Sequence, residues 1–194
     1  MVERANVAYV KIWGEVVGAV SWQGQANTGF ATFEYDPSFL QRGIDLSPIH
    51  MPASAANMLY EFRARNANPD LDTFKGLPGL LSDCLPDKFG NRIIEAWLAR
   101  QGRDPSSFTP VERLCYTGKR GMGALEFSPA LSSELDKHVP VEITQLVKLA
   151  REVVDMQSDL NVSVGTGRDT DALLEILRVG TSAGGARPKA VIAM

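Results

Sequence analysis

The groups best suited to chemistry in this chain lie in residues 180–194, GTSAGGARPKAVIAM. Two adjacent glycines let the backbone approach an anion closely, because they carry no Cβ, and small neighbours leave successive amides able to donate to phosphate oxygens. Arg187 and Lys189, which follow the two glycines, add positive charge. The apolar run that follows, residues 190–194, has strand character. The residues of this candidate phosphate-binding loop are Ser182, Ala183, Gly184, Gly185, Ala186, Arg187 and Lys189.

The spacing of this loop leaves two interpretations open. It matches neither the G-x-x-x-x-G-K-[ST] nor the G-x-G-x-x-G pattern, and glycine pairs form hairpin turns more often than ligand sites. A second Gly-rich stretch, residues 117–125, contains Lys119 and Arg120 and has the same two interpretations. Because a strand is expected after it, and phosphate sites commonly use a helix N-terminus, we interpret this second stretch as a turn.

Other catalytic patterns are weakly represented. The two histidines, His50 and His138, are far apart in the sequence and have no nucleophile motif nearby, which disfavours a catalytic triad. Asp83 and Asp87 lie at expected helix ends, where carboxylates cap backbone amides, so we interpret both as structural.

Composition limits the classes of function. A formal net charge of -3 and a pI near 5.4 argue against direct binding to nucleic acid or to an anionic membrane surface. No apolar run approaches the roughly 20 residues that span a bilayer, and the first residues lack the pattern of a signal peptide. Cys84 and Cys115 have no partners at metal-ligand spacing, so we expect free, buried thiols and a cytoplasmic protein.

The elements that would position these groups indicate an α+β fold. Alternating apolar residues predict a hairpin from strands at 7–13 and 16–22, turning at Gly14 and Glu15, and a third strand at 29–35. Asp36 before Pro37 predicts the N-cap of a short helix. Residues 46–51 are expected to be extended, whereas 53–69 fit either a short helix or an exposed insertion.

Helical periodicity begins at Leu77 and is interrupted at Pro86. The next helix should end before Gly102, and Thr109 to Glu112 forms a capping box that starts a helix through Cys115. A strand at 124–127 and helices over 140–156 and 169–178 complete the prediction. The apolar stripe of the helix before Gly102 is Phe89, Ile93, Ile94, Trp97 and Leu98.

Four segments in this order resemble the HipA family of toxin serine/threonine kinases: FEYDPSFLQRG, GLLSDCLPDKFGNRIIEAWLARQG, GKRGMGALEF and GTSAGGARPKAVIA. The family's Y-x-x-x-[WFY]-L segment is matched by Tyr35, Phe39 and Leu40. Its L-L-P-D-like stretch is matched by Leu85, Pro86 and Asp87, with Arg92 following.

The resemblance implies roles for the C-terminal loop. The S-x-x-G-A-x-x-K pattern falls on Ser182, Gly185, Ala186 and Lys189, and in HipA kinases this loop covers the phosphates of ATP. Its serine is an autophosphorylation site, and a phosphate there would add about two negative charges that repel the nucleotide. Pro188 departs from the family pattern and removes an amide donor, so we expect a shallower nest.

The resemblance also implies which catalytic groups, cofactors and partner proteins the complete protein would have. The catalytic base, the Mg²⁺ ligands and the phosphate-binding lysine follow the Gly-rich loop in these kinases. We therefore expect the N-terminal part of a kinase of a type II toxin-antitoxin system, inactive alone, whose complete form uses ATP and Mg²⁺. Whether this chain by itself is an enzyme stays open. The implied partners are a helix-turn-helix antitoxin and a protein substrate such as an aminoacyl-tRNA synthetase.

The expected organisation has three parts. Residues 1–52 form a β-rich subdomain, residues 53–138 a helical and mixed segment with a Gly-rich turn, and residues 139–194 helices leading to the phosphate loop and the start of a kinase-like N-lobe. Two alternatives remain: a non-catalytic regulatory module that binds a separately encoded partner, and an unrelated α+β domain with a Gly-rich hairpin.

Overall fold

A computed structural model describes residues 4–55, 59–63, 73–100, 102–121 and 123–131. By its internal contacts the chain divides into two compact units. The first comprises Met1–Leu85 and Asp104–Leu131, and the second comprises Pro86–Arg103 and Ser132–Met194. The predicted helices at 140–156 and 169–178, and the candidate loop at 182–189, lie outside the described residues.

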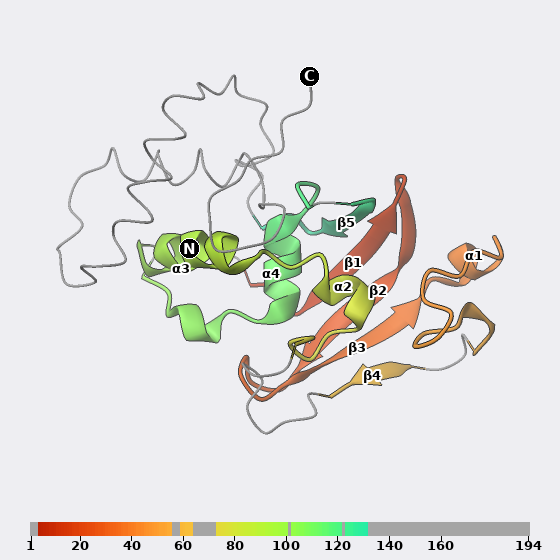
Figure 1. Cartoon of the computed structure of the whole chain (residues 1–194), viewed down its shortest axis with the longest axis horizontal. Coiled ribbons are helices and arrows are strands. Elements are labelled where there is room, and N and C mark those ends of the chain that lie inside the picture. Colours follow the sequence, from red (N-terminus) through yellow and green to blue (C-terminus); the bar gives the residue numbers. More distant parts are fainter. Residues whose placement is uncertain (1–3, 56–58, 64–72, 101, 122, 132–194) are drawn as a thin grey trace, which may run out of the picture. The chain divides into compact units, whose positions relative to one another are not determined.

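The first unit is built on a five-stranded antiparallel sheet in the order β4-β3-β2-β1-β5 (Figure 1). This sheet confirms the strands predicted near 7–13, 16–22, 29–35 and 124–127, and with the helices described below it confirms the α+β class. An edge strand lies within residues 53–69, where the sequence left two other possibilities open. The strands are β1 (Val7–Ile12), β2 (Glu15–Gln23), β3 (Phe30–Tyr35), β4 (Tyr60–Phe62) and β5 (Leu125–Ser128).

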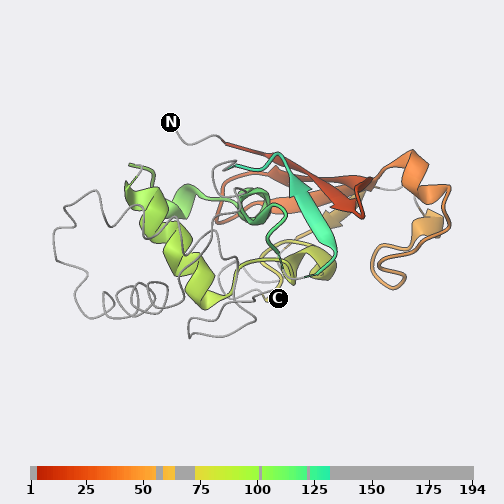
Figure 2. The same cartoon turned by 90° about the horizontal axis from the view of Figure 1, so that it is seen from above.

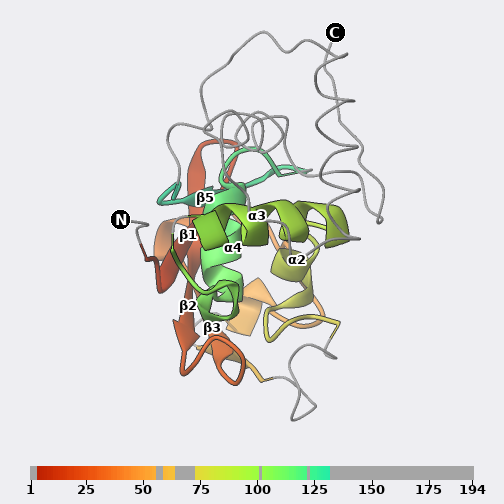
Figure 3. The same ribbon diagram turned by 90° about the vertical axis from the view of Figure 1, so that its left-hand side faces the viewer.

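One face of the sheet is covered by α4 (Pro110–Thr117), which contacts β1, β2 and β5 (Figure 3). The predicted capping box is confirmed: Glu112 N donates to Thr109 Oγ1 at 3.1 Å, and Thr109 N donates to Glu112 Oε2 at 3.0 Å. Residues of β1 alternate as a half-buried strand requires, since Ala8 and Val10 are buried while Val7 and Tyr9 are exposed. The buried set faces the core that α4 shares with the sheet.

The short helix α1 (Pro37–Leu40) follows β3 directly, as the sequence predicts. Phe39 packs in the core, where its ring stacks on that of Tyr35 with a centroid distance of 6.4 Å. The hydroxyl of Tyr35 donates to the carbonyl of Met51 at 2.8 Å. The aromatic positions of the family's Y-x-x-x-[WFY]-L segment are therefore core positions.

The expectation of an extended segment at 46–51 is wrong. Met51 N donates to the carbonyl of Ser47 at 2.9 Å, and the segment forms turns that lead into the 3-10 helix η1 (Ala53–Ala55). Asp45 explains the difference, because its carboxylate accepts from Ser47 N at 3.2 Å and from Ala53 N at 3.0 Å. Local side-chain acceptors of this kind compete with strand pairing.

A further described helix of the first unit, α2 (Gly79–Ser82), is a single turn. Leu81 within α2 and Leu77 just before it are buried, which agrees with the helical periodicity that begins at Leu77. The 3-10 helix η3 (Pro105–Ser107) precedes α4, and Asp104 caps it by accepting from Ser106 N at 2.9 Å.

The second unit contributes one described helix, α3 (Lys88–Arg100). Its start is capped by Asp87, which accepts from Gly90 N at 2.8 Å and so has the structural role predicted for it. Gly102, with a φ of +70°, follows the end of the helix as expected. Of the predicted stripe, Ile94, Trp97 and Leu98 are buried, and the side chains of Phe89 and Ile93 lie outside the description.

Candidate functional site

The candidate phosphate loop of Ser182, Gly184, Gly185 and Lys189 lies outside the described residues, as does His138. His50 is exposed in the turns after α1. Within the described ranges, no group of three or more His, Cys, Asp or Glu side chains could hold a metal ion. Over the same ranges, no helix has the length and apolarity needed to cross a membrane.

The second Gly-rich stretch is a structural turn between α4 and β5. The carbonyl of Gly118 accepts from Phe127 N at 3.1 Å, which joins the turn to the edge strand. Lys119 lies 4.0 Å from the carboxylate of Glu126. The guanidinium of Arg120 folds back onto the carbonyl of Tyr116 and lies 5.6 Å from the centre of its ring. Both cations therefore contact their own unit, which supports the interpretation of this stretch as a turn.

The two cysteines of the described chain are free thiols, as expected; Cys115 is buried as predicted, whereas Cys84 is only half-buried. Burial, followed by the nearby carboxylate of Glu112, raises the pKa of Cys115 to about 12. Burial, followed by Asp83, raises the pKa of Cys84 to about 11. Both groups remain protonated at neutral pH, and a thiol is a much weaker nucleophile than a thiolate. Neither cysteine is a candidate catalytic nucleophile.

The described part of the chain presents a different candidate site at the turn between β1 and β2. Ile12 pairs with Glu15, so the loop contains only Trp13 and Gly14. Both have positive φ, 52° and 82°, which identifies a type I′ turn. Trp13 is 75% exposed. The turn predicted from the sequence, at Gly14 and Glu15, was one residue too late. Trp is an unusual residue at a position with positive φ.

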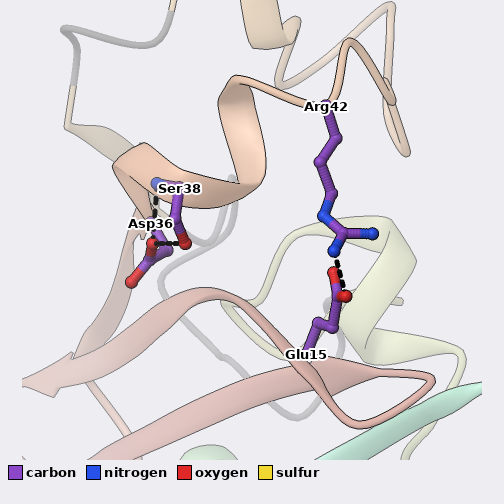
Figure 4. A network of polar contacts seen from close by, with 4 residues as sticks. All are labelled: Glu15, Asp36, Ser38 and Arg42. Carbon is purple, nitrogen blue, oxygen red and sulfur yellow. Dashed lines mark hydrogen bonds and ion pairs between the residues drawn. The ribbon is translucent and has the colours of Figure 1, made fainter.

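Figure 4 shows an ion pair and a helix cap in the segments that follow the β1–β2 turn and β3. Arg42, just after α1, forms an ion pair with Glu15 at the start of β2. Asp36 caps α1 by accepting from Ser38 N at 2.8 Å, and its own amide donates to the carbonyl of Val17 in β2 at 2.9 Å. We call Trp13, Glu15, Asp36 and Arg42 the turn surface. It lies at the end of the sheet where the β1–β2 turn and α1 meet (Figure 2).

The electrostatics of the turn surface are acidic. Hydrogen bonds from the hydroxyl and the amide of Ser38 lower the pKa of Asp36, so this exposed carboxylate stays ionised well into acidic conditions. Asp45 and Glu34 lie on the adjoining loop and strand. Within the turn surface itself, Glu15 and Asp36 outnumber the single cation Arg42, which pairs with Glu15.

Sequence reasoning did not single out Trp13. The available signal was a large aromatic residue directly before glycine in a two-residue hairpin loop, where Asn-Gly or Asp-Gly is usual. The predicted site residues at 182–189 and this surface are thus separate candidates, and the structure describes only the second.

Comparisons with known proteins support one assignment. The model of the HipA N-terminal domain matches residues 8–128, from β1 to the end of β5. This match includes three of the four segments that carry the resemblance and leaves the Gly-rich loop outside it. Searches among curated proteins and among solved structures gave no match. Because the match covers more than half of the chain, the chain belongs to the HipA N-terminal domain family.

Proposed function

We propose that this chain is the N-terminal part of a HipA-type serine/threonine protein kinase toxin of a type II toxin-antitoxin system. The observation that carries the proposal is the HipA N-terminal domain match over residues 8–128. In this proposal the chain contributes a docking surface for a helix-turn-helix antitoxin and the Gly-rich loop at 182–189, and it transfers no phosphate by itself.

The residues of the loop suit the cofactor that the proposal implies. Successive small residues from Ser182 to Ala186 leave amide donors accessible, and Lys189 supplies a point charge, which are the groups that bind ATP phosphates. Mg²⁺ would neutralise charge on the transferring phosphoryl group, using ligands outside this chain. Phosphorylation of Ser182 would place about two negative charges in the loop and so oppose nucleotide binding.

The test uses the longest reading frame that contains this sequence, purified and incubated with ATP and Mg²⁺. Mass spectrometry should find a phosphate on Ser182, and the variant Ser182→Ala should lose it. Lys189→Ala should weaken nucleotide binding, whereas Lys75→Ala, a change in the first unit, should not. Transfer to an aminoacyl-tRNA synthetase would support the proposed substrate class.

One result would replace the proposal by the regulatory alternative. If the protein takes up no phosphate but co-purifies stoichiometrically with a separately encoded kinase, the chain acts as a non-catalytic partner-binding module. If it neither takes up phosphate nor binds a kinase or a helix-turn-helix protein encoded beside it, both functions are rejected.

A further inference from the structure

We draw no further inference here: the strongest candidate, the sheet face on which Val7 and Tyr9 of β1 are exposed, carries none because nothing in the part of the chain that the structure describes shows what covers it.

Discussion

Tyr35 carries a hydrogen bond on which the end of β3 and the following loop both depend. Its hydroxyl is buried and donates to the carbonyl of Met51, which is also buried. Burial, then the charge of Asp45 and the neighbouring Tyr60, raises the pKa of Tyr35 to about 12, so the hydroxyl keeps its proton under ordinary conditions. The side chain fixes the turns at 46–51 from the core side.

We expect Tyr35→Phe to lower the free energy of unfolding by about 1–3 kcal/mol, because the buried Met51 carbonyl loses its donor. Urea denaturation followed by circular dichroism measures the change. Tyr9→Phe is the matched control, since Tyr9 is 52% exposed, and its effect should stay within about 0.5 kcal/mol. Equal effects of the two variants would show that the bond to Met51 contributes nothing.

At the scale of single residues, the sequence predicted those groups whose partners are close in the chain. Asp36 and Asp87 are caps because a carboxylate reaches an amide two or three residues on. The exposure of Trp13 and the bond from Tyr35 to Met51 could not be predicted, since each depends on how distant segments pack. The roles implied for Ser182 and Lys189 remain predictions.

Among the helices and strands, α4 has the most complete set of local sequence signals for its start. Thr109 and Glu112 satisfy two amide groups reciprocally, and Pro110 occupies the first helical position. Glu112 is 2% exposed, so its carboxylate lies in the core at the base of the helix. A buried capping box should contribute more than an exposed one, because water cannot replace the lost partners.

We expect Thr109→Ala to lower the free energy of unfolding by about 1–2 kcal/mol, since the amide of Glu112 loses its acceptor. Thermal and urea unfolding should agree on the size of the change. Thr28→Ala removes the same atoms from an exposed turn and should have an effect within about 0.5 kcal/mol. A loss no larger than that of the control would contradict a stabilising role for the capping box.

Elements were predictable where periodicity and a stop signal coincide, although the turn of the β1–β2 hairpin lies one residue earlier than predicted. The β1–β2 hairpin, α3 and α4 each have an apolar period and a terminal cap or glycine. The strand β4 has only three residues, Tyr60–Phe62, too few for alternation to be recognised. Residues 46–51 contain apolar side chains suited to a strand, but the carboxylate of Asp45 accepts from the amides of Ser47 and Ala53, and Met51 N donates to the carbonyl of Ser47.

For the whole molecule, the strand order could not be read from the sequence. Strands β1 to β4 follow one another, but β5 returns after the helical segments to pair with β1. This pairing joins Tyr9 to Ser128 and Ile12 to Leu125, residues more than a hundred positions apart. Such long-range pairing depends on the packing of α4, which lies between β1 and β5 in the sequence. No local sequence pattern encodes this packing.

The first unit also contains acids that stay protonated in the folded state because they are buried or, for Cys84, half-buried. Burial is the largest cause of the raised pKa of each of four groups: Tyr35, Cys84, Cys115 and Tyr116. An unfolded chain releases these protons near the ordinary values, 9.0 for Cys and 10.0 for Tyr, whereas the folded chain keeps them to higher pH. Stability is therefore fully present below pH 9 and is lost as the pH rises toward 12.

We expect the free energy of unfolding, measured with urea under reducing and oxygen-free conditions, to fall steadily between pH 9 and pH 11. Each group that is ionised only in the unfolded chain adds a slope of about 1.4 kcal/mol per pH unit. Cys115→Ala lowers the free energy of unfolding at pH 7, because it removes buried atoms. Above pH 9, however, the free energy of unfolding of this variant should fall less steeply than that of the unaltered chain, by the slope that one group contributes. Thr28→Ala should keep the original slope. If the free energies of unfolding of Cys115→Ala and of the unaltered chain fall in parallel with pH, the Cys115 thiol ionises equally in the folded and unfolded states. Its burial then does not contribute to the loss of stability at alkaline pH.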